Sequence, residues 1–63
     1  MKMIKVMDEY GEEIYVNIKH ILYIEKYEFK EGHSRIILFD SIVYVKGTPE
    51  EIVAMIHEAE GNK

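Results

Sequence analysis

The apolar residues of this chain change their spacing once, near residue 47. From Met3 to Lys46 apolar and polar side chains alternate, and β-branched and aromatic residues predominate, as in strands whose two faces meet different surroundings. From Thr48 to Ala59 the apolar residues recur at helical spacing. The sequence therefore predicts an α+β protein, in which about five antiparallel strands form a curled sheet or small barrel and one helix follows at the C-terminal end.

Five stretches fit strands, and short polar segments separate them. The expected strands are Met3 to Met7, Glu13 to Asn17, Leu22 to Phe29, Arg35 to Phe39, and Ile42 to Lys46. Glu9-Tyr10-Gly11-Glu12 and Lys30-Glu31-Gly32-His33 are expected to be hairpin turns, because each contains a glycine that can adopt positive φ. Asp40-Ser41 is a third, two-residue connection without glycine. Asn17 to Ile21 is expected to form a bend or a single helical turn.

The C-terminal helix has the clearest local signals. Thr48 is a good N-cap, Pro49 suits the first helical position, and Glu51 stands where it closes a capping box. Gly61 is placed to end the helix in a left-handed cap. These signals predict a helix over residues 48–60. Its expected apolar stripe is Ile52, Met55, Ile56 and Ala59, with Val53 at the border.

The chain has 63 residues, which indicates one small domain spanning residues 1–63. It has no cysteine, so neither disulfides nor thiolate-bound metal can stabilise it. A chain of this length hides only about 60% of its extended-chain surface by itself. We find no signal peptide and no apolar run near the roughly 20 residues that span a bilayer. A cytoplasmic location without membrane insertion is therefore expected.

Both faces of the predicted strands carry apolar side chains. One face is aliphatic and suits a core, with Ile4, Val6, Ile14, Val16, Leu22, Ile24, Ile36, Leu38, Val43 and Val45. The opposite face is more apolar and aromatic than a solvated face should be, with Met3, Lys5, Met7, Tyr15, Tyr23, Glu25, Tyr27, Ile37, Phe39, Ile42 and Tyr44. One short helix covers roughly one face. We therefore expect a homo-oligomer, most simply a twofold dimer, with an interface drawn from Met3, Met7, Tyr15, Tyr23, Tyr27, Ile37, Phe39 and Tyr44.

Two other interpretations of the aromatic residues stay open. Strand tyrosines often lie half-exposed with their hydroxyls in water. Alternatively, the rings could form a stacking platform for single-stranded nucleic acid, with Lys26, Lys30 and Arg35 as the phosphate contacts. The formal charge of −4 and the interleaved Glu25, Glu28 and Glu31 weaken the positive field that such binding needs.

No pattern in the chain carries catalytic chemistry. The three histidines fall in three different predicted elements, and Asp8, Glu9, Glu12 and Glu13 around the first turn lack the register of a calcium loop. Neither serine lies in a nucleophile elbow, and the four glycines are each isolated. We therefore expect no enzyme activity, no catalytic or metal site and no cofactor.

The spacing of several motifs resembles a family of small flagellar proteins. The motifs are Gly11-Glu12-Glu13-Ile14-Tyr15-Val16-Asn17, Ile21, Ile24-Glu25, Ile36-Ile37-Leu38, Val43-Tyr44-Val45, Pro49-Glu50-Glu51-Ile52-Val53 and Ile56. Over most of its length the chain thus resembles the FlbD-like family, also called the swarming motility protein SwrD family. The resemblance implies a cytoplasmic bacterial protein with a non-enzymatic role in motility. Residues 26–34 are longer than that family's short hairpin, and Asp40-Ser41 replaces a glycine-containing turn.

A weaker resemblance is to the carbon storage regulator family, which also has about five strands followed by a helix and dimerises. That family's RNA binding depends on arginine and a basic edge, whereas Lys46-Gly47-Thr48-Pro49 here offers one lysine. The first hypothesis is therefore a small protein-interaction or adaptor module that binds an unidentified protein partner. The alternative is a small nucleic-acid-binding regulator of phage or mobile-element type.

Overall fold

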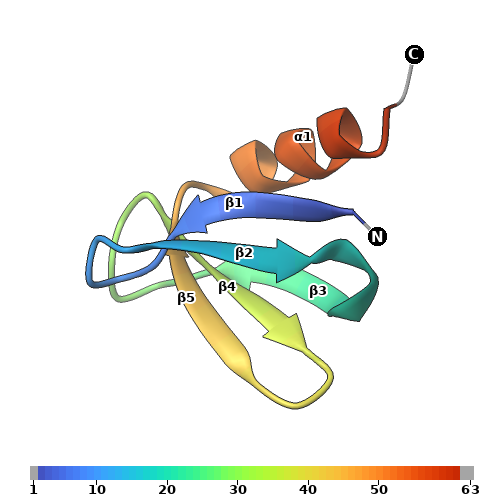
Figure 1. Cartoon of the computed structure of the whole chain (residues 1–63). Helices are drawn as coiled ribbons and strands as arrows, with labels where there is room; N and C mark the ends of the chain where they lie inside the picture. Colours follow the sequence, from blue (N-terminus) through green and yellow to red (C-terminus); the bar gives the residue numbers. More distant parts are fainter. Residues whose placement is uncertain (1, 62–63) are drawn as a thin grey trace.

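The computed structural model describes residues 2–61 and contains five strands, one short 3₁₀ helix and one α-helix (Figure 1). The elements are β1 (Met3–Met7), β2 (Glu13–Asn17), η1 (Ile18–His20), β3 (Ile21–Lys26), β4 (His33–Leu38), β5 (Ile42–Lys46) and α1 (Pro49–Ala59). All strand pairs are antiparallel. The α+β class, the order of the elements and the C-terminal helix are thus confirmed.

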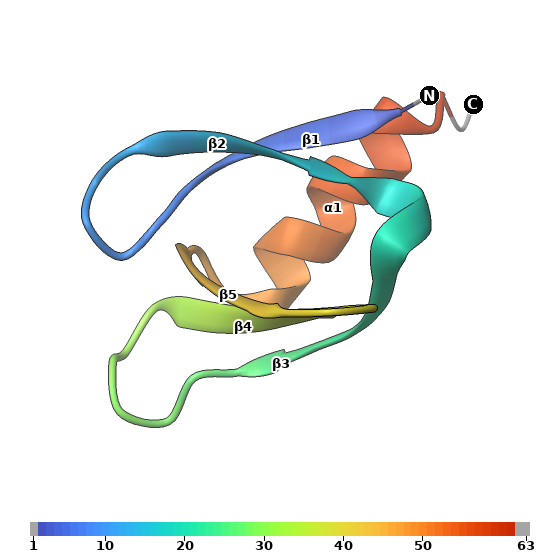
Figure 2. The same ribbon diagram turned by 60° about the horizontal axis from the view of Figure 1, so that its bottom comes forward.

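The strands form two sheets, and this corrects the expectation of one curled sheet or a small barrel. β1 pairs with β2, and β3, β4 and β5 form a second sheet in that order. Figure 2 shows the β1–β2 hairpin on one side of the molecule and the three-stranded sheet on the other. Within residues 2–61, one isolated antiparallel bridge, between Asp8 and Val45, links the two sheets. The strands therefore do not close into a barrel.

The core lies between the two sheets, and α1 completes it. Fully or almost fully buried side chains come from β1, β2, β4, β5 and α1: Ile4, Val6, Val16, Ile36, Val45 and Ile52. Helix α1 contacts β1 and β3, so it packs against the side of the two-sheet structure rather than covering one sheet face. The aliphatic faces of both sheets thus cover each other, as in other layered domains.

Leu22 departs from the alternation that placed it in the core. The pairing of β3 with β4 shifts between Ile21 and Tyr23, which leaves Leu22 as the extra residue of a β-bulge. Ile21 packs against the core in its place, and Leu22 is 54% exposed. The prediction that Leu22 lies in the core was wrong. The extra residue of the bulge changes the face of the sheet on which the preceding side chains lie.

Two strands also differ from their predicted bounds at both ends. The third strand begins at Ile21 and ends at Lys26 rather than extending to Phe29, because backbone hydrogen bonds close a turn over residues 27–33. The fourth strand spans His33–Leu38 instead of residues 35–39. The other three strands have the predicted bounds. The segment after Asn17 forms the expected single helical turn, and Gly11 and Gly32 in the first two turns have positive φ as expected.

Helix α1 begins with the predicted capping box. The Thr48 hydroxyl accepts a hydrogen bond from the Glu51 backbone N–H, and the Glu51 carboxylate accepts one from the Thr48 N–H. At the other end, Gly61 has a φ of 71°. On the predicted stripe, Ile52 is buried and Ile56 and Ala59 pack against the core. Met55 is instead 37% exposed, because it lies at the edge of the stripe beside β1.

Candidate functional site

The outer face of the three-stranded sheet is an uncovered surface on which apolar and aromatic side chains gather. Strand register arranges it in three cross-strand rows, namely Tyr23, Ile37 and Ile42, then Glu25, Arg35 and Tyr44, then Tyr27, His33 and Lys46. We call these nine residues the outer face. In Figures 1 and 2 no element of the described chain lies over it. The alternation of the strands produces this surface, since every second side chain points away from the core.

Aromatic rings on the outer face pack against one another. The ring centroids of Tyr27 and Tyr44 are 4.9 Å apart, and those of Tyr27 and Phe29 are 5.9 Å apart with an edge-to-face angle of 71°. Phe29 belongs to the turn after β3 and is 89% exposed. Such mutual contacts leave Tyr27 and Tyr44 half-buried, whereas Tyr23 and Ile42 in the first row are 55% and 46% exposed. The side chains of this surface therefore differ in how much of each is exposed to solvent.

A charged pair crosses the middle of the outer face. Glu25 on β3 and Arg35 on β4 are direct cross-strand neighbours, and the Arg35 guanidinium donates a hydrogen bond to the Glu25 carboxylate. Each side chain stays just over one third exposed. Because the two charges neutralise each other, the middle of the face has little net charge despite containing two ionised groups.

The structure divides the predicted interface residues among separate surfaces. Tyr23, Tyr27, Ile37 and Tyr44 lie together on the outer face. Phe39 lies in the turn between β4 and β5, where its ring centroid is 5.6 Å from that of His20. The remaining three belong to the β1–β2 hairpin, on the other side of the molecule: Met3, Met7 and Tyr15. A single flat contact with one partner thus cannot use all eight residues.

The three predicted nucleic-acid contacts lie on β3, on β4 and in the turn between them, and they differ in their surroundings. Arg35 is engaged by Glu25, whereas Lys26 and Lys30 are exposed on the strand end and turn that follow. The acidic Glu28 and Glu31 lie in the same turn region. The alternation of charge leaves no uniformly positive strip of the kind that phosphate binding favours. Nucleic-acid binding stays a prediction.

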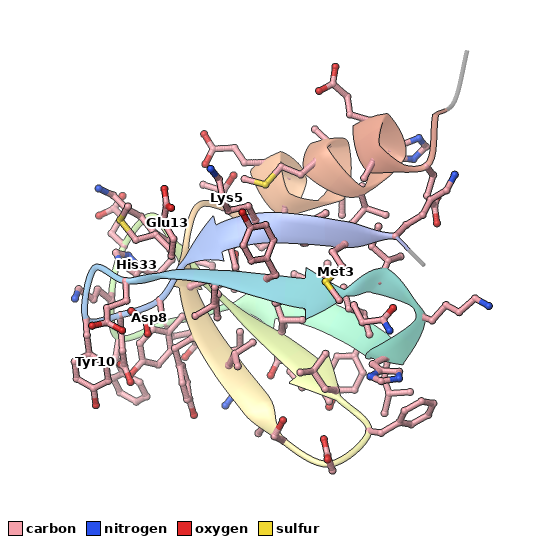
Figure 3. All side chains as sticks on the ribbon, in the orientation of Figure 1. Met3, Lys5, Asp8, Tyr10, Glu13 and His33 are labelled. Carbon is pink, nitrogen blue, oxygen red and sulfur yellow. The ribbon has the colours of Figure 1, made fainter. Side chains whose placement is uncertain are left out.

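The acidic turn between β1 and β2 has a structural arrangement of its own. The Asp8 carboxylate accepts hydrogen bonds from the backbone N–H groups of Tyr10 and Glu12, both at 2.9 Å. Figure 3 shows Asp8 at this end of the hairpin with Tyr10 at its tip, and Lys5 and Glu13 beside one another on the strands. In residues 2–61, no group of three or more histidine or acidic side chains is arranged to hold a metal ion.

No family model, curated protein or solved structure matches the chain. Among the helices of residues 2–61, none is long and apolar enough to cross a membrane. The resemblance to the FlbD-like family therefore stays a prediction that depends on the motifs quoted above.

Two features on or beside the outer face were missed by the sequence analysis. The first is the pairing of Glu25 with Arg35. A hairpin centred on Lys30 pairs residues whose numbers sum to 60, so the position of the turn could have predicted this pair. The second is the exposed Leu22 at the free edge of β3. Alternation gives no signal for Leu22, because a bulge interrupts alternation at a single residue.

Proposed function

We propose that this chain is a small, non-enzymatic interaction module that associates with a second copy of itself through the outer face. The observation that carries the proposal is the row of Tyr23, Ile37 and Ile42. It shares with the packed Tyr27 and Tyr44 rings a sheet face that no other element of residues 2–61 covers. Contiguous apolar patches of this kind on a soluble domain mark interaction sites. Aromatic side chains are also enriched at the centres of protein interfaces.

The size of the face sets the expected strength of association. Three strands of five or six residues cover about 14 Å by 20 Å. A standard interface buries about 800 Å² per partner, which is about one sixth of the 4671 Å² that the described chain exposes. The outer face, about 280 Å² in projection, is smaller than that standard interface. A dimer in rapid exchange, with a dissociation constant in the micromolar range, is therefore the expected state.

Two matched tyrosine variants test the proposal. Tyr23→Asp places a carboxylate in the first row of the outer face, where burial without a partner is unfavourable. Tyr15→Asp makes the same change on β2, where the side chain is 67% exposed on the other sheet. We expect sedimentation velocity to show a monomer for Tyr23→Asp and a dimer for wild type and Tyr15→Asp. Loss of the dimer in both variants, or in neither, would argue against this face.

The biological setting comes from the resemblance alone. If the chain acts as the FlbD-like resemblance implies, the dimer would serve bacterial motility as a bivalent adaptor. Self-association presents two copies of every remaining surface, including the β1–β2 hairpin with Met3, Met7 and Tyr15. Two linked copies raise the overall affinity for a repeated partner without any new contact.

A further inference from the structure

The charged pair on the outer face is complementary to itself. Glu25 and Arg35 lie side by side on β3 and β4, with side chains 37% and 36% exposed. Apolar or aromatic residues lie in the same face on either side of the pair: Tyr23 and Ile37 in one row and Tyr27 in the other. A surface with adjacent opposite charges can meet its own copy with each charge opposite its counterpart.

We infer that the dimer proposed above, on which this inference rests, has its twofold axis between β3 and β4 and parallel to them. Rotation about that axis sets Glu25 of each copy opposite Arg35 of the second copy. An axis running across the strands at the same level would instead set Glu25 against Glu25 and Arg35 against Arg35. Stacked sheets pack with their strands within about 30° of parallel or antiparallel alignment, which both axes satisfy. The repulsion between like charges therefore decides between them.

The same axis gives the apolar residues suitable partners. It sets Tyr23 opposite the second copy's Ile37, because these residues are cross-strand neighbours in the row beside the charged pair. Ile42 on β5 then lies beyond β3 of the second copy, next to the free edge of that strand. Leu22 is 54% exposed at that edge because of the bulge. This arrangement explains an exposed leucine that the fold of a single copy leaves uncovered.

A charge-swapped variant tests the position of the axis. E25R/R35E keeps an ion pair within each copy and preserves the cross-copy pairing between two swapped chains. In a mixed dimer with wild type, the inferred axis sets glutamate against glutamate and arginine against arginine. We therefore expect each protein to dimerise alone, and the mixed dimer to fall from the random half of all dimers to below about a tenth. Native mass spectrometry of isotopically labelled wild type with unlabelled variant measures that fraction.

A second swap supplies the control. Lys5 and Glu13 form an ion pair of 3.8 Å on the β1–β2 sheet, away from the outer face. K5E/E13K should mix with wild type at the random fraction. Random or preferred mixing of E25R/R35E with wild type would overturn the inferred axis while leaving the dimer itself intact. A monomeric wild type would instead overturn the proposed function, so the two failures are distinguishable. A monomeric but folded E25R/R35E would also overturn the inference, since the swap preserves complementarity.

A second measurement remains decisive if E25R/R35E fails to fold. The sequence contains no cysteine, so a single introduced cysteine reports unambiguously on its own position. Under mild oxidation, a mixture of Y23C and I37C should form the mixed disulfide at least about fivefold faster than Y23C forms a disulfide with itself, because the axis sets residues 23 and 37 opposite each other. Equal or reversed rates would overturn the inference.

Discussion

At the scale of single residues, the core depends on a few side chains that solvent does not reach. Ile36 lies in the central strand of its sheet, paired with Ile24 on β3 and Val43 on β5, and is fully buried. Its side chain belongs to the cluster that fills the space between the two sheets. Ile42 is the same residue type on β5 but points outward and is half-exposed. The two positions separate the effect of burial from that of residue type.

Ile36→Val should destabilise the fold by about 1 kcal/mol, because removing one buried methylene loses its transfer free energy and leaves a small cavity. Ile42→Val should change the free energy of unfolding by less than about 0.5 kcal/mol at a concentration where the chain is monomeric. Urea unfolding followed by circular dichroism measures both. Equal losses at the two positions would contradict the described core.

Ser34 is a polar side chain that the core encloses. It is fully buried, and its hydroxyl donates a 2.6 Å hydrogen bond to the Gly47 carbonyl. This bond ties β4 to the segment that leads into α1. Gly47 itself has a φ of 120°, and a Cβ there would lie 3.3 Å from the Ile52 side chain. A residue other than glycine would thus strain the backbone and crowd the core at this junction.

Ser34→Ala should cost about 1–3 kcal/mol of stability, since the change removes the donor that satisfies a carbonyl in a part-buried site. Ser41→Ala is the matched control, because Ser41 is exposed in the turn between β4 and β5. Its effect should remain within about 0.5 kcal/mol. The same urea titration compares them, and an unaltered midpoint for Ser34→Ala would mean that this hydrogen bond contributes nothing.

At the scale of elements, local chemistry determined what the sequence could predict. The start of α1 was predictable because its signals, Thr48, Pro49 and Glu51, are neighbours in the chain and need no tertiary contact. The turns at Gly11 and Gly32 were predictable for the same reason. The bulge at Leu22 and the end of β3 were not, because both depend on how β3 pairs with β4. The division into two sheets depends on contacts between residues that lie even farther apart in the sequence.

Thr48→Ala should lower stability by about 1 kcal/mol, because the Glu51 backbone N–H loses its acceptor at the helix start. Thr48→Ser keeps the hydroxyl and should retain most of that stability. Thermal and urea unfolding of the two variants beside wild type provide the test. If alanine and serine behave alike, the capping box does not stabilise α1 in solution.

At the scale of the whole molecule, one short chain covers its interior but leaves the outer face uncovered. The two sheets and α1 bury, fully or in part, the aliphatic side chains that the sequence assigned to the core, apart from Leu22. The second apolar face was also predictable, but its division between two sheets was not, since alternation does not reveal which strands are neighbours. Tyr23 and Tyr15 were therefore predicted as one surface, although they lie on different sheets.

Dimerisation through the outer face should make stability depend on concentration. A partner that binds only the folded chain raises the free energy of unfolding by mass action. The melting temperature of wild type should therefore rise as the protein concentration increases, whereas that of Tyr23→Asp should stay constant. Differential scanning calorimetry over a hundredfold range of concentration measures the difference. Parallel behaviour of the two proteins would contradict the link between this face and stability.

The solution mass of the wild-type chain is the decisive measurement for dimerisation through the outer face. Sedimentation equilibrium over a series from about 5 µM to about 500 µM covers the dissociation constants expected for a small interface. Dimerisation through the outer face predicts a weight-average mass that rises from near the chain's 7.5 kDa toward twice that value. A mass that remains at 7.5 kDa throughout the series would contradict it.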